Sequence, residues 1–170
     1  MTSTIHPLAA LAEATEQAVK DNPGNAHAVF KARGHGTTGV ASTISVGRHT
    51  LVVDEPPALG GEDGAPNPVE TALAGLLSCQ VVTYRVWAAK LGIALDDVHI
   101  GIEGDLDVRG FFGFDDSVRP GFGEIRVNVQ LTGPESAEAY QRLQDAVDEH
   151  CPVLDLFSNQ TPVKTTLSTR

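Results

Sequence analysis

The feature that most constrains the fold is a long apolar helix predicted between Asn67 and Gly92. Asn67 is a favourable N-cap, Pro68 suits the first helical turn, and Glu70 stands where the acid of a capping box belongs. Residues 69–79 are apolar nearly all round, which is typical of a helix that is buried on most of its faces. Gly92 suits the C-terminal cap. We therefore expect a fold in which other elements cover this helix.

The segments before the helix predict one further helix and a small sheet. Residues 7–20 carry apolar side chains at helical spacing, which predicts a short amphipathic N-terminal helix. Three β-prone runs follow, and glycine-containing turns at 34–36 and 47–48 separate them. Short strands so closely spaced indicate an antiparallel meander, with the strands at 29–33, 40–46 and 50–53.

The segments after the helix add strands first and helices later. Residues 98–107 and 124–131 alternate in the manner of strands, and a glycine- and phenylalanine-rich segment joins them. Pro134 opens a second helix, Pro152 starts a short third one, and residues 161–168 are predicted to form a closing strand. This order favours a single α+β domain over residues 1–170, not the alternation of a parallel sheet.

Composition and charge exclude several classes of function. A chain of 170 residues can bury a core without disulfides, and two cysteines are too few for a secreted disulfide scaffold. The formal net charge of −10 argues against nucleic acid or an anionic membrane as a partner. No apolar run approaches a membrane span, and residues 1–20 lack the pattern of a signal peptide. We therefore expect a soluble, cytoplasmic protein.

Metal, phosphate and serine-hydrolase chemistry are not indicated. The six histidines show no paired spacing, and the two cysteines do not form a CxxC motif. The glycine clusters lack the spacing of a phosphate-binding loop, and Ser78 lacks the G-x-S-x-G context. The cysteines are therefore the candidates for chemistry.

Cys79 lies two to three turns into the central helix, among apolar residues. A thiol reacts as the thiolate, and apolar surroundings oppose its formation, while the helix terminus is too distant to help much. A cation from elsewhere in the fold would have to assist, most simply Arg33 or Arg48. Glu70 precedes Cys79 by nine residues and falls on the opposite side of the helix, so it could act only through such an arginine. The alternative is that Cys79 is an inert core residue.

Cys151 is placed at the junction of two predicted helices. It precedes Pro152, where the backbone N–H groups of the next helix favour negative charge, and His150 could add a charge or a proton. The alternative is that Cys151 only ends the apolar stripe of the preceding helix. Two lone thiols at such positions suggest a pair of redox partners.

The segments around both cysteines resemble the OsmC/Ohr family (osmotically inducible protein C and organic hydroperoxide resistance). The resemblance implies an α+β, OsmC-like fold, with antiparallel sheets around two long central helices. It also implies an intertwined homodimer whose site lies at the subunit interface. The helix at 7–20 is then an addition. The resemblance rests on Asp54-Glu55-Pro56 with Gly60-Gly61, on Asn67-Pro68-Val69-Glu70 leading to Cys79, and on Cys151-Pro152-Val153.

The resemblance further implies a thiol peroxidase that serves oxidative stress defence. Cys79 resembles the peroxidatic cysteine, which reduces an organic hydroperoxide and becomes a sulfenic acid. Cys151 resembles the resolving cysteine, which forms a disulfide with it. A dithiol reductant, possibly of lipoyl type, restores both thiols, and no bound cofactor or metal is implied. An arginine, here Arg33 or its competitor Arg48, would be held by the acid Glu70 and keep the thiolate charged.

Two alternatives stay open because the tuning residues depart from the family pattern. In the peroxidase branches the acid directly follows the proline, whereas Val69 stands there and Glu70 comes one residue later, a turn of about 100°. The chain thus resembles the less characterised branches. One alternative is a dimeric binding protein for a small hydrophobic ligand, and another is thiol–disulfide exchange without peroxide. Four phenylalanines would form the pocket wall or pack in the dimer interface: Phe111, Phe112, Phe114 and Phe122.

Overall fold

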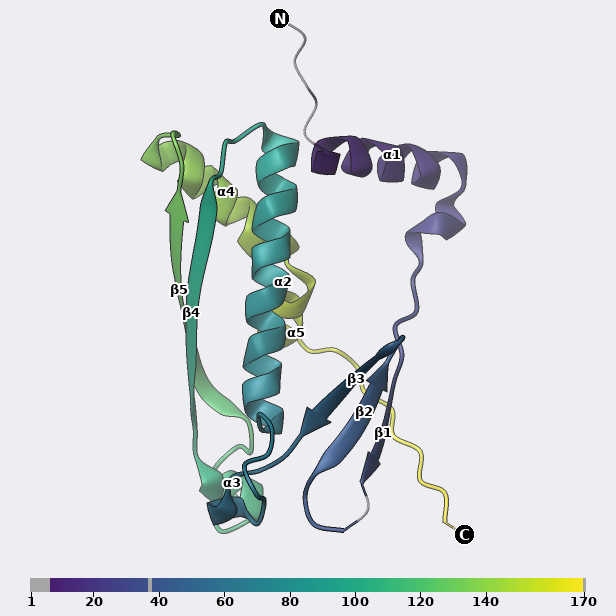
Figure 1. The fold of residues 1–170 in the computed structure, drawn as a ribbon, viewed down its shortest axis with the longest axis vertical. Coiled ribbons are helices and arrows are strands. Elements are labelled where there is room, and N and C mark those ends of the chain that lie inside the picture. Colours follow the sequence, from purple (N-terminus) through teal and green to yellow (C-terminus); the bar gives the residue numbers. More distant parts are fainter. Residues whose placement is uncertain (1–6, 37, 170) are drawn as a thin grey trace, which may run out of the picture.

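The computed structural model describes residues 7–36 and 38–169, and its elements have the predicted α+β order (Figure 1). Two separate antiparallel sheets accompany the helices. The elements in chain order are α1 (Pro7–Asp21), the 3-10 turn η1 (Pro23–Ala26), β1 (Ala32–Gly36), β2 (Ser42–Val46), β3 (His49–Val53), the 3-10 turn η2 (Pro57–Leu59), α2 (Pro68–Leu91), β4 (Asp97–Leu106), α3 (Val108–Phe112), β5 (Phe122–Thr132), α4 (Ala137–His150) and α5 (Pro152–Ser158).

The predicted boundaries of α2 are confirmed. The Asn67 side chain accepts a hydrogen bond from the Glu70 N–H at 2.8 Å, and Glu70 Oε2 accepts one from the Asn67 N–H at 2.9 Å. This reciprocal pair is a capping box, and it satisfies two N–H groups that the helix itself leaves unpaired. Gly92 ends the helix in the left-handed conformation, with φ of 67°.

Asp54 anchors the loop that leads from β3 to α2. Its buried carboxylate accepts hydrogen bonds from the N–H groups of Glu62 at 3.0 Å and Gly64 at 3.1 Å. Gly61 is required here because a Cβ atom at this position would lie 1.8 Å from the carbonyl oxygen of Glu55. Gly60 also adopts the left-handed conformation, with φ of 88°. The acidic residue and the two glycines therefore fix the path of the loop.

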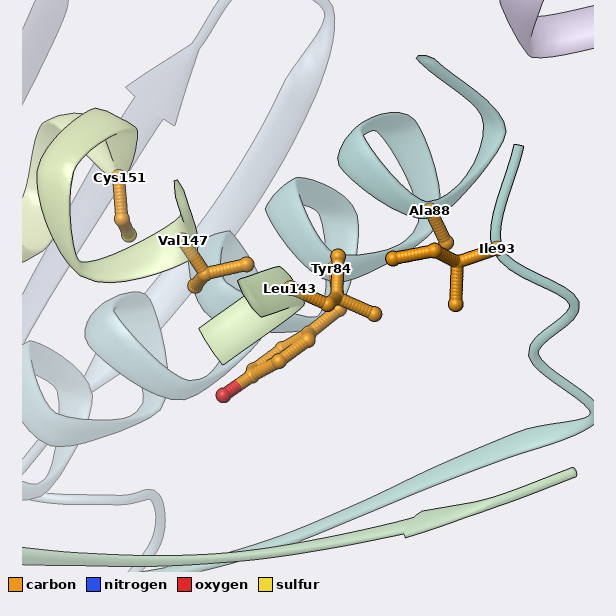
Figure 2. Packing of buried hydrophobic residues seen from close by; sticks show 6 residues of the cluster. All are labelled: Tyr84, Ala88, Ile93, Leu143, Val147 and Cys151. Carbon is orange, nitrogen blue, oxygen red and sulfur yellow. The ribbon is translucent and has the colours of Figure 1, made fainter. Parts of the chain in front are cut away.

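The core lies between α2, α4 and the β4–β5 hairpin. Tyr84 of α2 and Leu143 and Val147 of α4 are fully buried, and Figure 2 shows them side by side with Cys151 at the end of the row. Tyr84 also donates a hydrogen bond to Gln144. The predicted apolar stripe of α4 is thus confirmed, and Cys151 is its last member.

Helix α2 is less buried in this chain than its composition predicts. Its fully buried residues follow one side of the helix, whereas Val82 on the other side is 61% exposed. The expectation that no apolar run approaches a membrane span is corrected by α2, whose length and apolarity alone would let it cross one, a property that it shares with core helices of globular domains. Within the described chain, one face of this apolar helix therefore has no cover.

Sheet β1–β2–β3 forms the predicted meander, with a shifted first strand. Residues 29–31 lie outside β1, while Gly34, His35 and Gly36, predicted as a turn, belong to it. Pairing decides this, because β2 aligns Gly34 with Ile44 and Gly36 with Ser42 across the antiparallel ladder. Figure 1 shows this sheet to the side of α2, away from the β4–β5 hairpin.

The start of α4 and the predicted C-terminal strand also differ from the prediction. Helix α4 begins at Ala137 instead of Pro134, because Ser136 acts as the N-cap and its hydroxyl accepts a hydrogen bond from the Ala139 N–H. The closing strand predicted at 161–168 is wrong, since residues 160–169 form no regular structure within the chain. A strand needs a ladder partner, and the described residues pair none with this segment.

Candidate active site

The fold brings the two cysteines together although they are far apart in the sequence. Cys79 lies on α2, and Cys151 is at once the C-cap of α4 and the N-cap of α5. Their thiol groups share a hydrogen bond and form no disulfide. Cys79 is partly exposed, whereas Cys151 is 1% exposed. A molecule from solvent therefore reaches Cys79 first, and Cys151 is poised to react with Cys79.

The first turn of α5 points at Cys79 and not, as predicted, at Cys151. The backbone N–H of Val153 donates a hydrogen bond to the Cys79 sulfur, whereas the Cys151 side chain makes no capping bond to the helix. The Thr83 hydroxyl, one turn further along α2, lies near the sulfur but donates its hydrogen bond to the Cys79 carbonyl oxygen, at 2.8 Å. Both groups favour a thiolate on Cys79, and the Val153 N–H does so more strongly.

Burial outweighs these two donors within the single chain. Desolvation raises the pKa of the Cys79 thiol above its usual value, and the neighbouring Cys151 raises it further. The Val153 N–H and the Thr83 hydroxyl lower this pKa in part. No lysine or arginine of the described residues acts on the Cys79 sulfur. The thiol is therefore held close to its partner without the cation that would make it strongly acidic.

Neither candidate arginine lies at the cysteine pair in this chain. Arg33 lies on β1 and lines an open pocket on the exposed sheet. Phe30 and Val46 line the same pocket. Arg48 lies in the turn between β2 and β3. Neither contributes to the pKa of Cys79. Which of the two arginines assists Cys79 stays a prediction. In the predicted homodimer this arginine would come from the second copy of the chain.

The structure places Glu70 in the capping box of α2, away from the cysteines. Its carboxylate bonds to the Asn67 N–H, and among the described residues it forms no ion pair with an arginine. The predicted capping role is thus confirmed, while the predicted link through an arginine to Cys79 is not formed within the chain.

An aromatic stack, which the sequence reasoning missed, joins the cysteine region to α2. The ring of His150 lies parallel to that of Trp87, with 4.2 Å between centroids and 4° between planes. The Lys90 ammonium lies 4.1 Å from the centroid of the same indole. The sequence suggests His150 as a source of charge or protons for Cys151, whereas in the structure its ring packs on Trp87. Trp87 is the only tryptophan of the chain and lies two turns beyond Cys79, and this position was the feature of the sequence that could have indicated the contact.

A groove of about 450 Å³ lies next to this region on the side of β5; neither cysteine lines it, and Arg119 and Glu124 are among its lining residues. Leu76 of α2 and Leu154 and Phe157 of α5 supply much of its apolar wall, and Phe122 belongs to it as well. The other phenylalanines of this segment are exposed and contact one another at α3 and just after it, Phe111 edge to face with Phe112 and Phe112 stacked on Phe114. Only one of the four predicted pocket residues therefore lines this groove.

The described residues contain no group of three or more histidine, cysteine, aspartate or glutamate side chains that could hold a metal ion. The chemistry available at the site is that of two thiols and the N–H group of Val153, beside a groove with both apolar and charged lining residues. Two neighbouring thiols can form and break a disulfide.

Solved structures of similar fold come from several bacteria. An organic hydroperoxide resistance protein OsmC from Legionella pneumophila is 26% identical, with a TM-score of 0.60 over 77% of this chain and 90% of that chain. An OsmC-like protein from Mycoplasma pneumoniae is 17% identical, with a TM-score of 0.64 over 76% of this chain and 87% of that one. The organic hydroperoxide resistance protein OhrB of Bacillus subtilis is 23% identical, with a TM-score of 0.53 over 77% and 91%. A search of curated proteins found no match.

The sequence agrees with these structural similarities. The family described as OsmC-like protein matches residues 60–166, which include α2, both cysteines and every element from β4 to α5. The match covers more than half of the chain. The chain therefore belongs to the OsmC-like protein family.

Proposed function

We propose that this protein is a thiol-dependent peroxidase that reduces organic hydroperoxides. The observation that carries the proposal is the contact between a partly exposed Cys79 and a buried Cys151, with the Val153 N–H directed at the Cys79 sulfur. Similarity to a structure described as an organic hydroperoxide resistance protein supports the choice of substrate. The apolar wall of the groove at Leu76 and Leu154 suits the organic part of such a molecule.

The reaction proceeds in three balanced steps. The Cys79 thiolate attacks the terminal peroxide oxygen, the O–O bond breaks, and the alkoxide takes up a proton and leaves as an alcohol. The resulting Cys79 sulfenic acid condenses with the Cys151 thiol, which forms the disulfide and releases water. A dithiol reductant then transfers two electrons by exchange, becomes a disulfide itself, and restores both thiols.

The first step needs a cation, and we propose that a second copy of the chain supplies it through Arg33. Every residue of β1 is exposed, Val53 is the only buried residue of the sheet, and Ser42 and Ile44 of β2 are half-buried. Phe30, beside the sheet, is 93% exposed. Isolated sheets of this size require a packed face to be stable. The open face of α2 around Val82 is apolar and also lacks cover. A homodimer in which the sheet of one copy covers α2 of the other would meet both needs.

Glu70 is the proposed acid that holds this arginine. An ionised carboxylate can accept several hydrogen bonds, so Glu70 can keep the capping bond to Asn67 while it accepts another from the partner's Arg33. The proposed setting is the cytoplasm, where reductants keep both thiols available.

A free-thiol count tests the proposal. The protein is mixed with one equivalent of cumene hydroperoxide, and in parallel with hydrogen peroxide, and the remaining thiols are titrated over time. We expect rapid loss of two thiols per chain, faster with the organic peroxide. The Cys79→Ser variant should lose none, and Cys151→Ser should accumulate a sulfenic acid on Cys79. Thiols that stay unreacted for many minutes would refute the proposal.

The apolar wall of the groove and the raised pKa of Cys79 favour a second candidate, a dimeric binding protein for a small hydrophobic ligand. If the thiols stay inert, titration with an apolar fluorescent probe such as 1-anilinonaphthalene-8-sulfonate tests this candidate. A Leu154→Lys variant should then lose probe binding because it places a charge in the groove wall. Oxidation by glutathione disulfide without reaction with peroxides would instead indicate thiol–disulfide exchange.

A further inference from the structure

We propose that Trp87 is a positioning residue for the second chemical step, in which Cys151 forms the disulfide with Cys79. Trp87 acts through its stack on His150, the residue that precedes Cys151. The inference rests on the proposed function, since it names what holds the resolving cysteine in place.

Contacts at two separate points attach the α4–α5 junction to the same helix, and the Val153 N–H belongs to the first point, at Cys79. Cys151 meets Cys79, and His150 meets Trp87, eight residues further along α2. Eight residues correspond to about 12 Å along a helix axis. One contact would leave the junction free to rotate about it, whereas two separated contacts fix both its position and its orientation.

The stack adds to the other contacts that hold the junction. Helix α5 has no fully buried residue, and it is anchored by Leu154, which packs against the core cluster, and by the Val153 N–H directed at Cys79. The deeply packed residues of α4, Leu143 and Val147, lie one turn or more before the junction. Between them and α5, the side-chain contacts that fix the chain are those of His150 and Cys151.

The indole of Trp87 contacts both His150 and Lys90. His150 covers one face in parallel stacking, and the Lys90 ammonium approaches within 4.1 Å of the ring centroid. Trp87 also packs against the core cluster that contains Tyr84 and Cys151. A ring fixed in this way presents a stable surface to His150, and it transmits the rigidity of α2 to the junction.

The expected effect of losing the stack is a lower effective concentration of Cys151 at Cys79. An aromatic pair of ordinary strength changes an equilibrium by a factor of roughly 2 to 12. The disulfide should therefore form less favourably and more slowly by a factor of this size. The attack of Cys79 on peroxide should keep its rate, because neither Trp87 nor His150 is among the groups that act on the Cys79 sulfur.

The test measures the disulfide equilibrium against glutathione, in which the protein disulfide and two glutathione thiols exchange with the protein dithiol and one glutathione disulfide. Trp87→Leu and His150→Ala should each lower the proportion of protein disulfide, shifting the constant roughly 2- to 12-fold. His150→Phe should restore it, since a phenyl ring can stack on the indole without titrating. His99→Ala, which removes an exposed histidine of β4, is the matched control and should leave the constant unchanged.

Two further readouts separate positioning from general stability. The fluorescence of the only tryptophan should change in His150→Ala and return toward the native value in His150→Phe. After one equivalent of cumene hydroperoxide, the sulfenic acid should persist longer in His150→Ala, while the first step keeps its rate. If Trp87→Leu does not fold, the two His150 variants carry the test.

A glutathione constant unchanged in His150→Ala, or lowered and not restored by His150→Phe, would overturn the inference. A native protein that does not react with hydroperoxide would refute the proposed function instead. The glutathione equilibrium would still decide whether Trp87 positions Cys151, because it involves no peroxide.

Discussion

Replacing Val153 by proline should make Cys79 less acidic and less reactive at neutral pH. The substitution removes the backbone N–H that donates to the Cys79 sulfur. This hydrogen bond stabilises the thiolate more than the thiol, so its loss raises the pKa of Cys79. Position 153 lies in the first turn of α5, where the N–H has no acceptor within the helix and proline costs little of the helical hydrogen bonding.

The size of the effect follows from the kind of hydrogen bond. A hydrogen bond to a charged group contributes about 1.5–3 kcal/mol. Because the Cys79 side chain is partly exposed, solvent screens the interaction and the lower value applies. About 1.5 kcal/mol corresponds to a decrease of roughly tenfold in the thiolate population below the pKa, and therefore in the reaction rate there. Above the pKa of both proteins the rates should converge.

The assay is the alkylation of Cys79 by iodoacetamide from pH 6 to pH 11, in a Cys151→Ser background that leaves a single thiol. The rate–pH curve of Val153→Pro should move to higher pH with an unchanged plateau. Val153→Ala is the matched control, because it trims the same side chain and keeps the N–H, and its curve should stay in place. Overlapping curves for the proline and alanine variants would refute the reasoning, as would a lower plateau without a displacement, which would indicate damaged geometry.

Three further predictions concern the proposed dimer, the loop before α2 and the core. Arg33→Gln should move the Cys79 alkylation curve to higher pH by removing the partner's cation, whereas Arg48→Gln should not; equal, unmoved curves in both variants would contradict activation by an arginine. Backbone N–H groups of Gly64, Glu55 and Glu62 lower the pKa of Asp54, so its contribution to stability is present above the unfolded-state pKa, about 3.9, and is lost as pH falls through the lower folded-state pKa. Urea unfolding of Asp54→Asn should accordingly show lower stability at pH 7 and a weaker loss on acidification than the native protein, and parallel acid profiles would be inconsistent with this role. Leu143→Ala should lower the free energy of unfolding by about 2–5 kcal/mol, because the fully buried side chain leaves a cavity between α2 and α4, whereas Leu11→Ala on the exposed side of α1 should change it by less than about 1 kcal/mol.

The sequence alone was enough to predict α2 and its ends. Asn67, Glu70 and Gly92 act through contacts within a few residues, so the capping box and the left-handed terminus follow from local chemistry. The apolar stripe of α4 that ends at Cys151 was predictable for the same reason, since its spacing is that of one helix face. The order of the elements predicted the α+β class, and the family resemblance, carried by short motifs, added the OsmC-like fold and the proposed disulfide between the two cysteines.

Features that depend on pairing between distant segments could not be predicted in this way. Residues 34–36 form a strand because β2 lies beside them, although their glycines locally favour a turn. Residues 161–168 have strand-like composition but no ladder partner within the chain. In both cases hydrogen bonds to residues remote in sequence decide the outcome, and local propensity is overridden.

The tertiary structure also decided how the site is assembled. It directed the Val153 N–H to Cys79 and placed the His150 ring on Trp87, although the sequence had suggested that both would serve Cys151. Each of these contacts joins α2 to the α4–α5 junction, and their geometry depends on how the helices pack. The sequence by itself thus predicted α1, α2, α4 and α5 and the thiols that they carry, because those properties are local, whereas the short α3 was not predicted. Packing of α2 against the α4–α5 junction determined which groups surround each thiol, because that depends on contacts between segments far apart in the chain.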